Sequence, residues 1–414
     1  MGSVNGTSRT LVDWCLSSLT GPTGKRQSSE VDLSMLTVVV PSLDRQDYLL
    51  RQIRFWASSS AVLIVIDGST QPLDYRVRSA MEHHERMTYL HAQSSLSERL
   101  AMAAERIETP YAVLGADDEF HLQTGLSASL GILGESPELV GCVGQCLWFG
   151  IVGRAHHLVC GPSYPQHLGY SVRNPSPADR LMTAMSGYTP ATCYGVLRTP
   201  TWRSTWGSLQ DWSAPIAMEH QHAMAVYLLG GFVTTDHVQW LRSSENEMIV
   251  RPLSNSKITF TEWWTRSDAI VQAEYCKSVA TVVSQQLQVE VSEISTWVLE
   301  AIESYLVIQP QLDESHNKPA YKVTRLWRVH EVSRMLSNLL PDSLLLQVKS
   351  AKGRALRALG QRGGDYYGTL NEMPAILQSE GLILTSAAAA ELASIEATIQ
   401  EFNALRADPT LRVT

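Results

Sequence analysis

From residue 36 onward, short runs of apolar, mostly β-branched residues alternate with segments in which apolar residues recur at helical spacing. The pattern predicts strands at 36–40, 62–66, 87–91, 111–114 and 232–241, and helices at 48–56, 96–107 and 219–229. Buried parallel strands read as continuous apolar runs, and crossover helices join them. The alternation therefore predicts an α/β domain with a mostly parallel, Rossmann-like sheet.

Three other stretches lack this alternation. Residues 1–35 are rich in Ser, Thr and Gly and are expected to form an N-terminal extension outside the core. Gly, Pro, Ser and aromatic residues dominate 142–202, a composition that suits loops around a ligand. After residue 261 the strand pattern nearly vanishes, and helices are predicted at 263–288, 291–308, 321–340 and 387–405. We expect an extension (1–35), an α/β catalytic domain (36–256) and an all-α domain (257–414).

Length, composition and charge limit the class of protein. A chain of 414 residues exceeds the size at which one hydrophobic core usually stops growing. The apolar fraction of 44% and the charged fraction of 18% are typical of a globular protein. A formal net charge of −8 argues against non-specific nucleic-acid binding, which needs a basic face. These values favour a soluble protein of two domains.

The location and redox state follow from two further features. No apolar run approaches the roughly 20 residues that cross a bilayer, and the N-terminus lacks the pattern of a secretory signal. The six cysteines are scattered and include no C-x-x-C pair. We therefore expect a cytoplasmic protein without a transmembrane segment, whose thiols are reduced and mostly buried.

Polar and acidic residues follow three of the predicted strands. They are Pro41-Ser42-Leu43-Asp44-Arg45, Asp67-Gly68-Ser69 and Asp117-Asp118-Glu119. In an open α/β sheet, ligands bind outside the carboxyl ends of the strands. Clustered carboxylates favour a cation, and Mg²⁺ and Mn²⁺ bind through one or two carboxylates while substrate phosphates fill other positions. No glycine-rich phosphate loop follows these strands, so the pattern predicts a metal-assisted nucleotide-diphosphate site.

With these motifs the sequence resembles the family 2 glycosyltransferases and their GT-A relatives, over roughly residues 36–245. The family's first strand ends in Pro, a small or hydroxyl residue and often Asn-Arg, which residues 39–45 match except at Asp44. Its Asp-Asp-Gly-Ser is Ile66-Asp67-Gly68-Ser69 here, and Gly115 stands where its metal signature commonly has Asp. The resemblance implies a GT-A domain that transfers a sugar from a nucleotide diphosphate to an acceptor hydroxyl, with Mn²⁺ or Mg²⁺.

The resemblance also implies roles for individual residues. The implied nucleotide-sugar-binding residues are Pro41, Ser42, Arg45, Asp67, Gly68, Ser69, Arg99, Asp117 and Arg242. The implied metal ligands are Asp118, the likelier direct ligand, with Asp117 and His237. For Arg99, pairing with Glu98 or Glu105 on its own helix is an equal alternative to a phosphate contact.

An inverting transfer needs a carboxylate that removes the proton of the acceptor hydroxyl. The family places this acid at a helix start after the acceptor loop, where the present sequence has Ala217-Met218-Glu219-His220. We expect Glu219 to be the base and Asp211 to be its competitor. The alternative interpretation of Glu219 is an ordinary acid in the first turn of a helix, stabilised by the helix dipole.

Two other functions fit part of the pattern. A nucleotidyltransferase would use similar strands and acids, but it normally has a glycine-rich basic loop after its first strand. A degenerate GT-A module could instead act as a non-catalytic scaffold, because Gly115 and Ile66 replace two expected acids. We expect the helical half to supply acceptor specificity or self-association into a homo-oligomer. The sequence identifies neither the sugar nor the acceptor.

Overall fold

The computed structural model describes residues 10–20, 31–245, 258–316, 341–344, 346–348, 350–351 and 368–407. Its centre is one eleven-stranded mixed sheet with the order β11-β7-β6-β9-β4-β1-β2-β3, in which β10 pairs with β5, β6 and β8. The strands are β1 (Leu36–Ser42), β2 (Val62–Asp67), β3 (Met87–His91), β4 (Tyr111–Leu114), β5 (Phe120–His121), β6 (Leu139–Val152), β7 (His157–Ser163), β8 (Ser171–Val172), β9 (Val196–Arg198), β10 (Gly231–Ser243) and β11 (Gly368–Thr369).

The strands β4, β1, β2 and β3 are parallel neighbours, and Val39 of β1 lies opposite Ile64 of β2. Both faces of β1 and β2 are buried, which explains their continuous apolar sequence. The connecting helices are α2 (Gln46–Trp56), α3 (Tyr75–Glu82) and α4 (Leu96–Ala104). The predicted α/β fold is confirmed, and the predicted strands match the observed ones to within about two residues.

The region 142–202 is wrongly predicted as loops. It holds most of β6, which is 14 residues long, as well as β7, β8 and β9. The helices α6 (Pro177–Ser186) and α7 (Thr199–Ser204) also lie here, with 3-10 turns at Pro165–His167 and Pro190–Thr192. A Cβ on Gly141 would lie 2.7 Å from Phe232, and one on Gly144 would lie 2.4 Å from the carbonyl oxygen of His237. These glycines allow β6 and β10 to approach closely, and they hide the strand pattern in the sequence.

The expectation that residues 1–35 lie outside the core is wrong for α1 (Leu11–Leu19). Trp14 and Cys15 on this helix are fully buried. The Trp14 ring lies 6.1 Å from the ring of Phe402, and the Trp14 carbonyl accepts a 2.7 Å hydrogen bond from Arg54 of α2. The composition of the segment is polar, but its few apolar residues close the core between α2 and the last described helix. All six cysteines are buried and unpaired, as expected.

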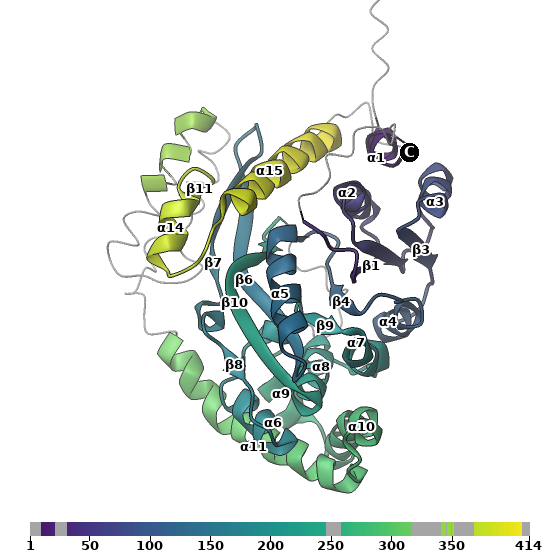
Figure 1. Cartoon of the computed structure of the whole chain (residues 1–414), viewed down its shortest axis with the longest axis vertical. Coiled ribbons are helices and arrows are strands. Elements are labelled where there is room, and N and C mark those ends of the chain that lie inside the picture. Colours follow the sequence, from purple (N-terminus) through teal and green to yellow (C-terminus); the bar gives the residue numbers. More distant parts are fainter. Residues whose placement is uncertain are drawn as a thin grey trace, which may run out of the picture.

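The remaining helices lie in two groups (Figure 1). One group, green in the figure, packs on α6 and α8 and consists of α9 (Phe260–Arg266), α10 (Ala269–Leu287) and α11 (Val291–His316); α8 is Pro215–Leu229. The other packs on β7 and α5 (Gln123–Glu135) and consists of α14 (Met373–Ser379) and α15 (Ser386–Ala407).

These helices share hydrophobic clusters with the sheet and its flanking helices. The Tyr275 hydroxyl of α10, for example, donates a 2.9 Å hydrogen bond to the carbonyl of Ala217 in α8. The helices predicted near 263–288, 291–308 and 387–405 are confirmed, whereas 321–340 lies outside the described residues. The division into domains at residue 257 stays a prediction. Within the described part of the chain, no helix combines the length and apolarity that a membrane span requires.

Candidate functional site

The ends of β1 and β4 bring a hydroxyl, a guanidinium and two carboxylates into contact. The Ser42 hydroxyl donates a 2.8 Å hydrogen bond to Oδ2 of Asp117. Nη1 of Arg45 lies 3.0 Å from Oδ1 of Asp117 and 2.9 Å from Oδ2 of Asp118. Because β1 and β4 are parallel neighbours, their carboxyl ends meet at one edge of the sheet. The structure thus brings together four of the residues that the sequence singled out.

A strained turn holds Arg45 in place. Asp44 has a φ of 55°, in the left-handed region that Asp enters more readily than most residues. Its backbone amide donates a 2.8 Å hydrogen bond to the Ser69 hydroxyl, which ties the end of β1 to the end of β2. Pro41 lies opposite Ile66 in the same register. Left-handed backbone at a non-glycine residue is concentrated at functional sites.

Asp67 is fully buried and serves the loop rather than the cavity. Its Oδ1 accepts a 2.9 Å hydrogen bond from the Ser69 amide. Its Oδ2 accepts a 2.8 Å bond from the Tyr89 hydroxyl and a 3.4 Å bond from Gln46. The sequence placed Asp67 against the base or ribose, whereas Asp67 is fully buried and does not line the cavity formed by residues 44–48, 69–71 and 406. Asp67 therefore fixes the turn through which Ser69 meets Asp44.

Arg99 lies beneath these strand ends and is almost fully buried. Its Nη1 donates to the carbonyls of Ser42, at 2.5 Å, and Ile66, at 3.4 Å. Burial lowers the pKa of Arg99 against the opposing effect of the nearby acids. A Cβ on Gly68 would lie 2.6 Å from Cζ of Arg99, so this glycine makes room for the guanidinium. Glu98 instead closes a capping box with Ser95. Arg99 contacts the strand ends and, through Nε, the Ser95 carbonyl at 3.3 Å, and no ion pair to Glu98 or Glu105 is found among the described residues.

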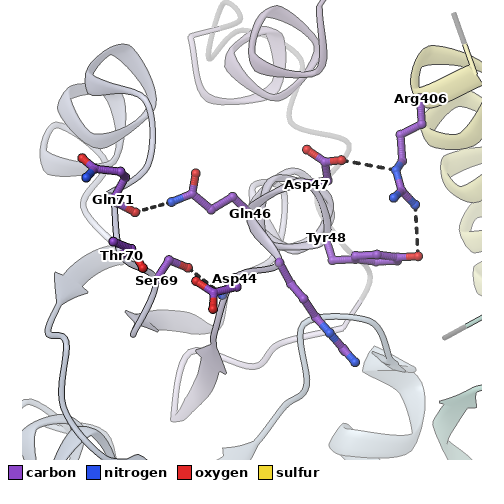
Figure 2. Close-up of a pocket in the computed structure, with 9 residues that line it drawn as sticks. Asp44, Gln46, Asp47, Tyr48, Ser69, Thr70, Gln71 and Arg406 are labelled. Atoms are coloured by element: carbon purple, nitrogen blue, oxygen red, sulfur yellow. Dashed lines mark hydrogen bonds and ion pairs between the residues drawn. The ribbon is translucent and has the colours of Figure 1, made fainter. Parts of the chain in front are cut away.

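A cavity of about 470 Å³ opens beside this cluster. Polar side chains dominate its lining, which comprises Asp44, Arg45, Gln46, Asp47, Tyr48, Ser69, Thr70, Gln71 and Arg406. Figure 2 shows Arg406 reaching from α15 to the start of α2, where its Nη1 donates to the Tyr48 hydroxyl at 3.1 Å and its Nε lies 3.3 Å from Asp47. Sequence analysis missed Arg406, which stands 358 positions from Tyr48 and belongs to no local motif.

The next acid along the chain, Glu119, is enclosed further inside. Its Oε2 accepts a 2.6 Å hydrogen bond from Nε1 of Trp240, and burial raises its pKa to about 7. Burial and the neighbouring charge of Asp118 raise the pKa of Asp117 to about 6, although Arg45 opposes the shift. Glu119 was visible in the Asp-Asp-Glu motif but was not selected as a site residue. Burial thus raises the pKa of both carboxyls above the ordinary range of Asp and Glu.

Arg242 connects this acidic group to the candidate base. Its Nη1 donates a 2.6 Å hydrogen bond to the hydroxyl of Tyr164, a residue with a φ of 51°. Its positive charge lowers the pKa of both Glu119 and Glu219, so the guanidinium acts on the two acids at once. The sequence placed Arg242 at the diphosphate; in the described structure its hydrogen-bond partner is Tyr164.

Glu219 stands in the second turn of α8 rather than at its start, because the helix begins at Pro215. The helix-dipole interpretation of Glu219 is therefore wrong. Its Oε1 accepts a 3.0 Å hydrogen bond from the Tyr188 hydroxyl, and burial raises its pKa although Tyr188, Cys193 and Arg242 oppose the shift. Asp211 is exposed in the loop that precedes α8. Of the two candidate bases, Glu219 alone is surrounded by ordered polar side chains.

The donor set does not fit the divalent cation that the sequence predicted. Ser42 and Arg45 already bond the two oxygens of Asp117, and Arg45 also bonds Asp118. Nδ1 of His237 lies 3.2 Å from Asp236, next to it in the chain. Within the described ranges, no three His, Cys, Asp or Glu side chains are grouped as metal ligands, so only the carboxylates of Asp117 and Asp118 could serve a cation, and both already bond the Arg45 guanidinium. The predicted shell of Asp117, Asp118 and His237 is not assembled.

No protein-family model matches the chain, and no curated protein sequence matches it. Solved structures do match in architecture. S. aureus TarS 1–349 with UDP-GlcNAc is 8% identical, with a TM-score of 0.44 over 88% of this chain and 91% of that chain. Mannosyltransferase PcManGT from Pyrobaculum calidifontis, with GDP-Man and Mn²⁺, is 11% identical, with a TM-score of 0.37 over 79% and 92% of the two chains. These values describe overall architecture and transfer no residue role to this chain.

Proposed function

We propose that this chain is a glycosyltransferase that moves a sugar from a nucleotide diphosphate to an acceptor hydroxyl. The observation that carries the proposal is the junction of the polar cavity with the Arg45–Asp117–Asp118 cluster at the carboxyl edge of the parallel strands. This edge is where open α/β sheets bind their ligands. A pocket lined by carboxylates, amides and hydroxyls matches the donors and acceptors of a base and a ribose.

In this proposal the nucleotide-sugar donor lies along this edge with its nucleoside at one end and its sugar at the other. The nucleoside occupies the cavity between Asp44 and Gln71, and the diphosphate extends toward Arg45, because guanidinium groups bind phosphate oxygens in pairs. The sugar then lies beside Asp118, beyond the diphosphate. Arg406 closes the outer wall of the nucleoside pocket through its bonds to Asp47 and Tyr48.

Glu219 is the base of an inverting transfer in this proposal. Its carboxylate takes the proton of the acceptor hydroxyl while the acceptor oxygen forms a bond to the anomeric carbon. The bond between that carbon and the diphosphate oxygen breaks on the opposite face, and the nucleoside diphosphate leaves. The raised pKa of Glu219 supports this role, because a base works best when its pKa is near the working pH. No step passes through Mn²⁺ or Mg²⁺, since the donor set does not fit them.

The test is a screen of nucleotide sugars for binding and for release of the nucleoside diphosphate. A ligand at a hundredfold excess over its dissociation constant stabilises the native state by about 2.7 kcal/mol, so melting temperature detects it. We expect sugar nucleotides of one base to stabilise the protein, and Asp117→Leu to abolish the effect. Asp236→Leu, at an exposed acid outside the cluster, is the matched control and should bind normally.

Two other results would redirect the assignment. Stabilisation without transfer to any acceptor, together with no slow hydrolysis of the donor, indicates the non-catalytic scaffold. Tighter binding of nucleoside triphosphates than of sugar nucleotides, with release of pyrophosphate, indicates a nucleotidyltransferase. If no nucleotide or nucleotide sugar changes the melting temperature, the proposed function is wrong.

A further inference from the structure

We propose that Arg45 takes the place that a divalent cation has in the family that the sequence resembles, so that the nucleotide diphosphate binds to this chain without metal. The inference rests on the proposed function, since it concerns the same donor site. It follows from three features: the ion pairs of Arg45, the space at Gly115 and the direction of the remaining guanidinium N–H groups.

The guanidinium of Arg45 already bridges the two carboxylates that a cation would bridge. A single nitrogen, Nη1, lies 3.0 Å from Asp117 and 2.9 Å from Asp118. The three side chains are 15%, 8% and 14% exposed, so the pairs are largely shielded from water. Water screens the attraction within a shielded ion pair little, and removing one partner leaves the other charge buried and unpaired. A cation would have to displace this nitrogen.

A second guanidinium contributes to the same balance of charge. Arg99 lies beneath the strand ends, and the charges of Asp67 and Asp117 both act on it. Arg45 likewise interacts with Asp117 and Asp118. Two arginines therefore offset two of the three negative charges of Asp67, Asp117 and Asp118 without a metal ion.

The sheet is tightly packed at the position of the further acid of the family signature. Gly115 stands at that position, and its amide donates a 2.8 Å hydrogen bond to the carbonyl of Val39. A Cβ there would lie 3.2 Å from Cγ2 of Val40 and 3.4 Å from Cγ1 of Val38. Both valines are fully buried in β1, so a side chain at this position would require Val40 to move by a few tenths of an ångström. The glycine therefore fits this packing better than an acid would.

Arg45 also lines the cavity in which we propose that the donor binds. A guanidinium carries five N–H donors, and both ion pairs of Arg45 use Nη1. Arg45 lines the cavity together with Ser69, and its ion pairs within the described part of the chain do not use Nε or Nη2, which can therefore donate to phosphate oxygens. The left-handed turn at Asp44 fixes this orientation before the ligand arrives. Arg45 thus joins the acids to the diphosphate, as a bridging cation would.

The experiment compares nucleotide binding with and without metal. Calorimetry measures the dissociation constants of UDP and GDP for the full chain in EDTA and in Mn²⁺, and we expect the value for the nucleotide that binds to agree within about twofold. Arg45→Met should weaken binding at least tenfold in EDTA. Mn²⁺ should restore part of the affinity of this variant, because the acid pair is then open to a cation. Arg54→Met, which removes another arginine of α2, is the matched control and should bind normally.

Each outcome decides between the two proposals. If the wild-type chain binds in Mn²⁺ and loses more than tenfold of its affinity in EDTA, the metal-free inference is wrong and the proposed function stands. The inference also fails if Arg45→Met binds in EDTA as the wild type does. If neither UDP nor GDP nor any other nucleotide binds under either condition, the proposed function fails and this inference fails with it. The comparison on the wild type needs no variant, so an unfolded Arg45→Met leaves the test intact.

Discussion

The hydroxyl of Tyr188 donates a 3.0 Å hydrogen bond to Oε1 of Glu219, the carboxylate that we propose as the base. Glu219→Gln keeps the shape and the hydrogen-bonding reach of the side chain but removes its basicity. We expect turnover to fall about 10²- to 10⁴-fold, with little change in donor affinity. Asp211→Asn is the control and should remain active. Steady-state kinetics and calorimetry separate the two effects, and a dead Asp211→Asn beside an active Glu219→Gln would exchange their roles.

The same hydrogen bond predicts a shift in the pH profile. Tyr188 stabilises the charged form of Glu219 and thereby lowers its pKa, against the larger raising effect of burial. Tyr188→Phe removes this contribution, so the pKa of Glu219 rises further. The acidic limb of the kcat/KM profile should then move to higher pH, because more alkaline solution is needed to deprotonate the base. A limb that stays in place or moves to lower pH would contradict the assignment.

Gly68→Ala tests the packing of Arg99. The added Cβ would lie 2.6 Å from Cζ of Arg99, so the guanidinium must leave the carbonyls of Ser42 and Ile66. We expect a loss of stability of about 1–3 kcal/mol and weaker nucleotide binding. The control is Gly131→Ala in α5, where no atom lies within 4 Å of the new Cβ. This change should stabilise the chain by about 0.5–1 kcal/mol and leave binding unchanged. Urea unfolding measures both.

Arg51→Met tests a buried ion pair behind the site. The Arg51 guanidinium is fully buried, lies 2.8 Å from Glu245 and donates a 2.9 Å hydrogen bond to the Asp118 carbonyl. Removing it leaves Glu245 buried and without its partner, which typically costs about 3–5 kcal/mol. Arg76→Met, at an exposed pair with Asp13, should change the free energy of unfolding little. Equal effects of the two substitutions would contradict this prediction.

Four buried histidines predict acid sensitivity of the fold. Burial lowers the pKa of His167, His220 and His222 to about 3 and that of His121 to about 4. The unfolded chain therefore binds more protons than the folded chain between about pH 6.5 and these values. Stability should be fully present above about pH 6.5 and fall as the pH drops, by up to about 1.4 kcal/mol per pH unit for each histidine.

Unfolding titrations at a series of pH values measure this slope. His167→Phe removes one titrating group and should therefore reduce the slope by about one proton. Phenylalanine should be tolerated there, because the ring nitrogens of His167 have no hydrogen-bond partner among the described residues. If the free energy of unfolding is constant between pH 7 and pH 5, these histidines bind protons equally well in the folded and unfolded chain, and the prediction is wrong.

The sequence predicted the parallel strands because both faces of β1 and β2 are buried, which leaves an uninterrupted apolar run. It could not predict β6, because Gly141 and Gly144 interrupt the apolar sequence of that strand. These glycines allow β10 to approach β6 closely. The convergence of Ser42 and Asp117 was predictable, because parallel strands end at one edge whatever the details of the loops. Contacts between residues that lie far apart in the sequence could not be predicted.

Asp67 and Arg45 show that a sequence motif does not predict the partners of its residues. Asp67 matched a motif for base and ribose contacts, yet its Oδ2 accepts from Tyr89 of β3, a contact that depends on the sheet order. Arg45 matched a motif for nucleotide binding, yet its ion pairs occupy carboxylate oxygens of Asp117 and Asp118 that were expected to bind a metal ion. A motif identifies which residues gather at the edge, whereas their partners depend on the three-dimensional arrangement.

The outer wall of the nucleoside cavity has a consequence for how the chain matures. Asp44 to Gln71 emerge early from the ribosome, but Arg406, which completes the cavity, is synthesised more than 330 residues later. Phe402 of the same helix also packs against Trp14 of α1, so α1 cannot complete its packing until α15 has been synthesised. Domains fold as units and begin during synthesis. We expect nascent chains that end before α15 to retain nucleotides poorly, so nucleotide capture should report that α15 has been synthesised and has packed against α2.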